Sequence, residues 1–211
     1  MVRRDFPRPT RRRFLVGAAA AISAFPGAAR AGAAVGAPAP DFAMPDTQGR
    51  MVRLSALRGR VVALEWTNPL CPFAGKHYEA GAMQALQRET LAAGGSWYSV
   101  ISYPRESVGY ASELEAELLA ETRRSAATAT LLDPDTALAK LYDARATPHI
   151  FIVDRAGVLA YAGGMDSVAS TEIADIARAE PYARDALRAV VAGLPVARPV
   201  TAPYGCQVKH L

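Results

Sequence analysis

The residue with the clearest chemical potential is Cys71, which lies between an apolar run and a segment of helical pattern that begins with proline. A cysteine at such a junction lies near unpaired backbone N–H groups and the positive end of the helix dipole, and both favour its thiolate. The thiolate is the nucleophile in disulfide exchange and in peroxide reduction. Lys76 and His77, about one helical turn further on, would add positive charge. We therefore expect Cys71 to be a reactive thiol. The alternative is that Cys71 is a small hydrophobic residue buried in the core.

The second cysteine of the chain is Cys206, in a proline-rich segment close to the C-terminus. Its natural role outside the cytoplasm is to pair with Cys71, either permanently or as a resolving partner, although the sequence does not fix the distance between their Cα atoms. Thiolates with imidazole nitrogens also suit copper or zinc, so metal binding is an alternative function. The candidate ligands, which lack the close spacing of a typical metal motif, are Cys71, His77, Cys206 and His210.

Other polar side chains near these positions are candidates for supporting roles. Glu65 could relay a proton to Cys71 if it were buried, but a partly exposed carboxylate at a strand end is the favoured interpretation. Arg105 and Arg145 could each place a cation in the cleft expected beside Cys71, although a solvated surface charge is the favoured interpretation for both. His149 is interpreted as a packed strand residue.

The elements that would position these residues alternate between strands and helices. The expected strands cover residues 61–66, 97–102, 130–132, 149–153 and 158–161, with a short edge hairpin over residues 41–54. The expected helices cover residues 72–93, 107–124, 135–143 and 170–192, the last broken at Pro181. Residues 154–157 form a turn that would pair the last two strands antiparallel.

This order indicates an α/β fold with a mixed central sheet and helices on both faces. The 211 residues, 51% of them hydrophobic, are enough for one sizeable core. We expect one domain over residues 35–195, followed by a tail over residues 196–211 that carries Cys206.

The first 31 residues have the pattern of an export signal: basic residues, an Ala/Gly-rich apolar run, and small residues before a cleavage site. The apolar run is shorter than the roughly 20 residues of a membrane-spanning helix, so we expect removal and no stable membrane anchoring afterwards. Arginines followed by Phe14-Leu15 resemble the twin-arginine signal, which implies a periplasmic protein.

Removal of this segment would also change the charge of the chain. Seven of its 24 basic residues and one of its 20 acidic residues lie within positions 1–31, which leaves 17 basic and 19 acidic residues. No basic cluster with interleaved aromatic residues remains, so we expect no nucleic-acid partner.

Two segments resemble the thioredoxin-like superfamily, and specifically the redoxin family of alkyl hydroperoxide reductase and thiol-specific antioxidant proteins. The first is Trp66-Thr67-Asn68-Pro69-Leu70-Cys71-Pro72-Phe73. The second runs from Thr147-Pro148 to Gly157 and is similar to the family pattern Thr-Pro-x-x-Phe-x-x-Asp-x-x-Gly, in which the proline is cis. The resemblance covers about residues 35–192. It implies a catalytic set of Cys71, Cys206 and Pro148, and a substrate cleft lined by Trp66, Asn68, Pro72 and Thr147. Lys76 and Arg145 are candidate cations because of their positions in the sequence near Cys71 and Pro148.

The chain departs from the family pattern at functional positions. Ala74 replaces the second cysteine of the usual Cys-x-x-Cys pair, so exchange within that motif is impossible. Leu64, Asn68 and Pro148 occupy the places of the proline, threonine and arginine of true peroxiredoxins, so donors that stabilise the breaking O–O bond are missing and fast peroxide reduction is not expected. The Gly-Cys-x-x-Lys pattern around Cys206 resembles the ending of a peroxiredoxin-like subgroup and supports a designated role for this cysteine.

The leading hypothesis is a periplasmic thiol-disulfide oxidoreductase or slow thiol peroxidase, with Cys71 as nucleophile and Cys206 as candidate resolving residue. It requires no metal or organic cofactor. Its partners would be an external thiol reductant and a peroxide or protein disulfide. Two alternatives stay open: a copper-binding metallochaperone of thioredoxin fold, and a redox-silent module that binds an extended protein segment beside Pro148.

Overall fold

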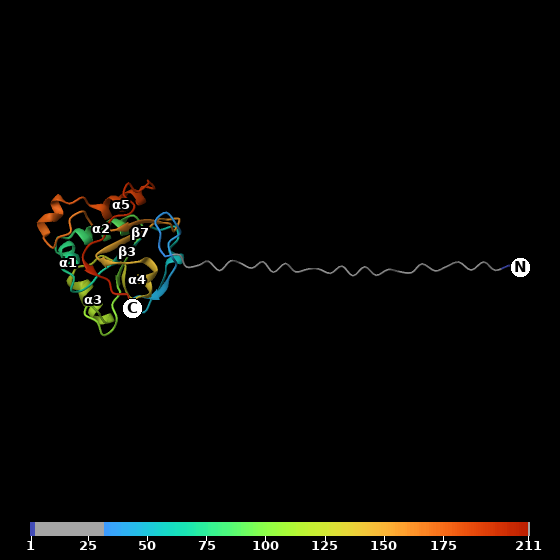
Figure 1. The fold of residues 1–211 in the computed structure, drawn as a ribbon, viewed down its shortest axis with the longest axis horizontal. Coiled ribbons are helices and arrows are strands. Elements are labelled where there is room, and N and C mark those ends of the chain that lie inside the picture. The colour runs from blue at the N-terminus through green and yellow to red at the C-terminus, as the bar shows by residue number, and fades with distance from the viewer. Residues whose placement is uncertain (3–31, 211) are drawn as a thin grey trace.

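The computed structural model describes residues 1–2 and 32–210, so the predicted export signal lies outside the described residues apart from its first two. At the centre of the fold is a five-stranded sheet in the order β5-β4-β3-β7-β8 (Figure 1). Its strands are β3 (Val62–Trp66), β4 (Ser96–Ile101), β5 (Ala129–Leu132), β7 (His149–Val153) and β8 (Leu159–Gly163). β3 pairs parallel with β4 and antiparallel with β7. The predicted mixed sheet of a thioredoxin-like fold is therefore confirmed.

The central strand β3 is buried along its whole length because both faces of the sheet are covered. Alternate side chains of a strand point to opposite faces. Leu64 and Trp66 accordingly pack into one apolar cluster, together with Tyr142 and Phe151. Ala63 lies in the second cluster, on the opposite face.

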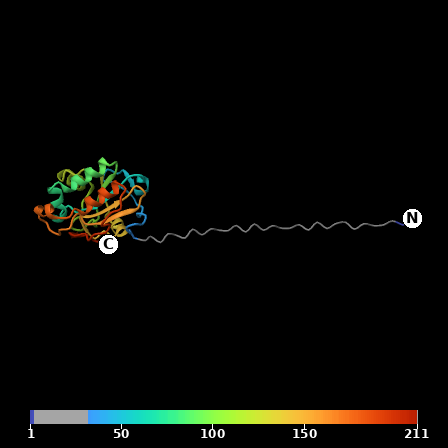
Figure 2. The same cartoon turned by 90° about the horizontal axis from the view of Figure 1, so that it is seen from above.

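Helices cover the two faces as predicted (Figures 1 and 2). One cluster receives side chains from α1 (Pro72–Glu79), α2 (Ala82–Ala92) and α5 (Tyr182–Val191). The other cluster receives side chains from α4 (Ala137–Tyr142) and from the 3-10 helix η1 (Leu54–Leu57). Ala116 of α3 (Glu113–Thr122) packs against Ile101 of β4 in a third, smaller cluster.

The single helix predicted over residues 72–93 is wrong in one respect, because the structure divides it into α1 and α2. Gly81 separates them with a φ of +74°. A right-handed helix cannot continue through this left-handed conformation, which glycine adopts without steric cost. The break leaves α1 as a short helix that begins directly after Cys71.

Three other helix predictions need shorter bounds. α3 begins at Glu113 instead of residue 107, because Ser112 and Glu115 form a reciprocal capping box that fixes its first turn. α4 covers only Ala137–Tyr142. The region 170–192 contains the 3-10 helix η2 (Ile173–Arg178) and then α5, with the predicted break at Pro181 confirmed.

Two small sheets complete the described part of the chain. The predicted edge hairpin is present as β1 (Ala43–Pro45) and β2 (Met51–Arg53). In the second small sheet, the C-terminal strand β9 (Cys206–Gln207) pairs antiparallel with β6 (Ala146–Thr147). Among the helices of residues 1–2 and 32–210, none has the length and apolar character needed to cross a membrane.

Candidate active site

Cys71 occupies the predicted junction between strand and helix. It is the N-cap residue of α1, and Pro72 is the first residue of that helix. The side chain is buried, with 2% of the residue exposed. Its Sγ donates to the carbonyl oxygen of Thr147 at 3.0 Å. The thiol therefore lies in a confined position, between the start of α1 and the strand β6.

The peptide bond between Thr147 and Pro148 is cis, as the family resemblance implies. Thr147 is completely buried. It is the register partner of Cys206 in the β6–β9 pair, and its hydroxyl donates to the Cys206 carbonyl oxygen at 3.4 Å. One residue, Thr147, thus contacts both cysteines.

The two thiols are free and hydrogen-bonded to each other. Burial opposes ionisation of Cys71, but the hydrogen bonds from Cys206 and Thr147 and from nearby backbone N–H groups outweigh it and lower the pKa of Cys71. Burial and the hydrogen bond to Cys71 raise the pKa of Cys206. Cys71 is therefore the more acidic thiol of the pair, and Cys206 keeps its proton.

Gly205 allows the tail to approach this closely. Its φ is +128°, and a Cβ atom at this position would lie 2.0 Å from the Thr147 carbonyl oxygen. No other residue fits without moving the backbone. Gly205 is the glycine of the Gly-Cys-x-x-Lys pattern in the sequence.

The proposed cleft residues do not all lie at a surface. Trp66 is fully buried, and its Nε1 donates to Ser102 Oγ at 2.9 Å, so this side chain supports the sheet. Asn68 is buried and accepts from the backbone N–H of Leu70 at 2.7 Å. Pro72 is exposed at the start of α1.

The candidate cations have partners elsewhere. Lys76 is buried and donates to the carbonyl oxygen of Val168 at 3.0 Å. Arg145 is an exposed side chain paired with Asp143, which agrees with the favoured interpretation as a surface charge. Arg105 donates to the hydroxyl of a nearby tyrosine at 2.9 Å.

His77 differs from the expectation that it adds positive charge near Cys71. Burial lowers the pKa of His77 to about 4, because the ring loses hydration that stabilises its charged form. The imidazole is therefore neutral at neutral pH.

Arg123, the residue after α3, is a functional candidate that the sequence analysis missed. Its guanidinium donates to Thr67 Oγ1 at 3.0 Å and to the Asn68 carbonyl oxygen at 2.9 Å. It also stacks over the ring of Tyr78, 4.6 Å from the centroid. Arg123 therefore fixes the turn that ends at Cys71. No local spacing in the sequence indicates this contact.

Tyr103 was also missed. It is buried, and its hydroxyl donates to the Gln207 carbonyl oxygen at 3.2 Å. Burial raises the pKa of Tyr103, and the nearby charges of Cys71 and Cys206 add to the effect. This tyrosine therefore forms a wall of the site, next to the tail.

The interpretation of Glu65 as a partly exposed carboxylate is wrong. Glu65 is completely buried because it lies on the central strand, and it accepts hydrogen bonds from Tyr78 Oη at 2.8 Å and Trp97 Nε1 at 2.9 Å. Burial raises the pKa of Glu65 despite these donors. Its hydrogen-bond partners stabilise the packing between β3, β4 and α1.

Of the alternative metal ligands, the structure brings Cys71 and Cys206 together, but neither histidine completes a metal site with them. His77 Nε2 lies 3.2 Å from the Tyr204 hydroxyl, whereas His210 Nε2 lies 2.7 Å from the Ala144 carbonyl oxygen. His149 packs against Phe151 as expected of a strand residue, with ring centroids 4.3 Å apart. Within the described residues, no three His, Cys, Asp or Glu side chains are arranged to hold a metal ion.

Comparison with known proteins connects this geometry to a family. The model of the AhpC/TSA family matches residues 35–162. No curated protein sequence matches the chain.

Similar folds occur among solved structures. A hypothetical protein of Sinorhizobium meliloti 1021 is 22% identical with a TM-score of 0.70, and the match covers 84% of this chain and 95% of that one. An uncharacterized conserved protein of Geobacillus kaustophilus is 25% identical with a TM-score of 0.69, covering 83% and 92%. A secreted disulfide oxidoreductase of Mycobacterium tuberculosis is 14% identical with a TM-score of 0.46, covering 56% and 79%. The first two likenesses extend over nearly all of the described chain.

Proposed function

Since this chain belongs to the AhpC/TSA family, we propose that it is a thiol-dependent oxidoreductase with Cys71 as the nucleophile and Cys206 as the resolving cysteine. The observation that carries the proposal is the contact between the two thiols, with opposite pKa shifts. A thiolate beside a protonated thiol is the arrangement that attack followed by resolution requires.

In the first step, the Cys71 thiolate attacks one oxygen of a hydroperoxide, and the O–O bond breaks. Cys71 becomes a sulfenic acid, and the leaving oxygen takes a proton to give an alcohol or water. With a disulfide substrate, the same sulfur forms a mixed disulfide and releases a thiolate.

In the second step, the Cys206 sulfur attacks the Cys71 sulfur. The S–S bond forms, Cys206 loses its proton, and the sulfenic oxygen leaves as water, or the substrate thiol leaves from a mixed disulfide. An external dithiol, or two thiol molecules, then returns two electrons and two protons to the pair. The proposed partners are therefore a thiol reductant and a peroxide or protein disulfide.

The side chains around Cys71 support slow rather than fast peroxide reduction. The Arg123 guanidinium is engaged by Thr67 and the Asn68 carbonyl oxygen, and Arg145 pairs with Asp143. Neither is then available to stabilise the oxygen that leaves when the O–O bond breaks.

The proposed location is the periplasm, reached by twin-arginine export. The support comes from the arginines and apolar run within residues 1–31. An oxidising compartment also suits a function that cycles between two thiols and a disulfide.

Timed thiol trapping tests the proposed function. The mature protein is reduced, mixed with one equivalent of hydrogen peroxide or oxidised glutathione, quenched with an alkylating reagent and mapped by peptide mass spectrometry. We expect both free thiols to disappear together as a Cys71–Cys206 crosslink forms. With Cys206→Ser, Cys71 should accumulate as sulfenic acid or as the glutathione adduct. Thiols that stay alkylatable with both oxidants would overturn the catalytic assignment.

A further inference from the structure

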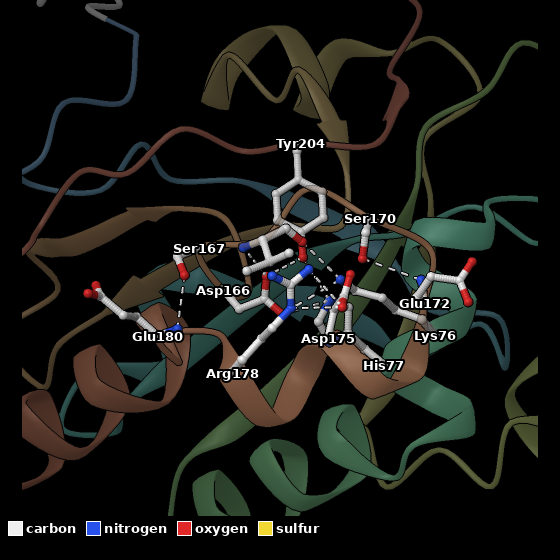
Figure 3. A network of polar contacts seen from close by, with 11 residues as sticks. Lys76, His77, Asp166, Ser167, Ser170, Glu172, Asp175, Arg178, Glu180 and Tyr204 are labelled. Atoms are coloured by element: carbon white, nitrogen blue, oxygen red, sulfur yellow. Dashed lines mark hydrogen bonds and ion pairs between the residues drawn. The ribbon is translucent and has the colours of Figure 1, made fainter.

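A buried polar cluster lies beside the tail segment that carries Cys206, and the reaction described above does not use it. We call it the Tyr204 cluster, and it consists of Lys76, His77, Asp166 and Tyr204 (Figure 3). Lys76 and His77 come from α1, Asp166 follows β8, and Tyr204 lies two residues before Cys206. Three segments that are distant in the sequence therefore meet at one tyrosine hydroxyl.

The hydroxyl of Tyr204 is a donor to the Asp166 carboxylate. Burial and the adjacent carboxylate raise the pKa of Tyr204, so the hydroxyl keeps its proton. The neutral His77 ring places Nε2 3.2 Å from the same oxygen. Because the tyrosyl proton is directed to Asp166, the ring must donate from Nε2. The Tyr204 oxygen thus has two polar partners.

Lys76 provides the countercharge that Asp166 needs in a buried position. Its Nζ lies 3.8 Å from Asp166 Oδ2 and 5.1 Å from the centroid of the Tyr204 ring. The side chains of Lys76 and Asp166 are 0% and 6% exposed. A buried carboxylate without such a partner would be strongly unfavourable.

The helix α1 supports both cysteines. Cys71 is its N-cap, and Lys76 lies within the helix at the Tyr204 cluster. The ring of Phe73, also in α1, packs edge-on against Tyr204 with centroids 6.0 Å apart. The contacts of Tyr204 with α1 therefore connect the tail that carries Cys206 to the helix that follows Cys71.

The tail has other attachments that do not depend on Tyr204. β9 pairs with β6, the backbone N–H of Val208 donates to the Arg145 carbonyl oxygen at 3.0 Å, and Val208 is buried in the core. Loss of the Tyr204 hydroxyl should therefore leave the tail docked but less precisely placed at Cys206.

We propose that Tyr204 is a positioning residue for the Cys71–Cys206 couple, its hydroxyl anchoring the tail to Asp166 so that the Cys206 sulfur faces Cys71. This inference rests on the proposed function, because it assigns a role in closing that disulfide. Orientation of the reacting groups raises the effective concentration of one thiol at the other.

The test is a redox titration of the pair in glutathione buffers. Closure oxidises the two protein thiols to one S–S bond, while one glutathione disulfide takes up two electrons and two protons to give two glutathione thiols. Alkylation and mass spectrometry measure the closed fraction at each glutathione ratio. The variants are Tyr204→Phe and the matched control Tyr142→Phe, which removes a buried hydroxyl that donates to the Pro40 carbonyl oxygen at 2.7 Å.

We expect the closure constant of Tyr204→Phe to be about tenfold below that of wild type, because a less precisely placed Cys206 lowers the effective concentration of its thiol at Cys71. This corresponds to ~30 mV in reduction potential. Tyr142→Phe should have the same closure constant as wild type, even if it lowers the unfolding free energy as much as Tyr204→Phe does. Equal constants for Tyr204→Phe and wild type, or equal losses in both variants, would overturn the positioning role. A wild-type protein that forms no Cys71–Cys206 disulfide at any ratio would instead overturn the proposed function.

Discussion

Cys71 and Thr147 are joined by a hydrogen bond of 3.0 Å between the thiol and the backbone carbonyl oxygen. Thr147 is at the same time the register partner of Cys206. The strand before the cis-proline therefore aligns the two cysteines, one through its carbonyl group and the other through strand pairing. A carbonyl oxygen accepts only from the protonated thiol, so the thiolate depends on the donors around it, of which Cys206 is the first.

Replacement of Cys206 should therefore change the acidity of Cys71. In Cys206→Ala the thiol donor is lost, and we expect the pKa of Cys71 to rise from its lowered value, with slower alkylation near neutral pH. In Cys206→Ser a hydroxyl donor remains, so the change should be smaller. The pH dependence of the Cys71 alkylation rate measures both variants. The same profile in wild type and Cys206→Ala would show that Cys206 does not stabilise the thiolate.

Gly205→Ala should detach the tail from β6. The new Cβ would lie 2.0 Å from the Thr147 carbonyl oxygen, and the φ of +128° is unfavourable for alanine. We expect a loss of roughly 1–3 kcal/mol in unfolding free energy, and slower formation of the Cys71–Cys206 disulfide in thiol-trapping experiments.

Gly193→Ala is the control for this change. Gly193 has a φ of +70°, but a Cβ there has no atom within 4 Å. Gly193→Ala should therefore introduce backbone strain without a steric clash, and the Cys71–Cys206 disulfide should form as fast as in wild type. If both variants close the disulfide equally fast, the close approach at Gly205 does not position Cys206.

Features that depend on local motifs could be predicted from the sequence. The position of Cys71 follows from an apolar run that ends before a proline, and the cis peptide follows from the Thr147-Pro148 motif. The break at Gly81 was missed because the apolar residues on either side continue a pattern close to helical spacing. The positive φ of this single glycine ends α1 and separates it from α2.

Contacts made across the fold could not be predicted in this way. Arg123 reaches the turn before Cys71 from the end of a different helix, and Tyr103 reaches Gln207 from a loop after β4. Burial of Glu65 depends on helices packed over its face of the sheet. Neither periodicity nor spacing in the sequence contains this information, because the partners are set by the tertiary arrangement of the elements.

Glu65 should make the stability of the protein depend on pH. Burial raises the pKa of Glu65 in the folded state above the ordinary value of 4.5, so its contribution to stability is present below that value and is lost as the pH rises through the folded pKa. In Glu65→Gln we expect this pH dependence to disappear. Urea unfolding at several values between about pH 4 and pH 8 measures it.

Glu65→Leu separates charge from hydrogen bonding. It removes the acceptor for Tyr78 and Trp97, so we expect a loss of about 1–3 kcal/mol at every pH. If the unfolding free energy of Glu65→Gln depends on pH as steeply as that of wild type, ionisation of Glu65 is not the source of the pH dependence.

Export should depend on the arginines that precede Phe14-Leu15. Replacement of Arg11 and Arg12 by lysine keeps the charge, but we expect the protein to accumulate in the cytoplasm, since the twin-arginine signal requires arginine. Cell fractionation and immunoblotting measure the distribution. The same replacement of Arg3 and Arg4, an arginine pair not followed by Phe-Leu, should leave export unchanged. Equal export of both variants would argue for another route.

Arg123 should control the reactivity of Cys71 through the turn that precedes it. Arg123→Lys keeps the charge, but a lysine cannot donate to Thr67 and the Asn68 carbonyl oxygen from one planar group. We expect a loss of about 1–3 kcal/mol in unfolding free energy and slower alkylation of Cys71, because the turn no longer holds the sulfur at the start of α1. The control is Arg155→Lys, an exposed side chain that donates to the Val191 carbonyl oxygen at 3.1 Å. If alkylation of Cys71 slows equally in both variants, the effect does not come from the turn, and Arg123 serves only to stabilise the fold.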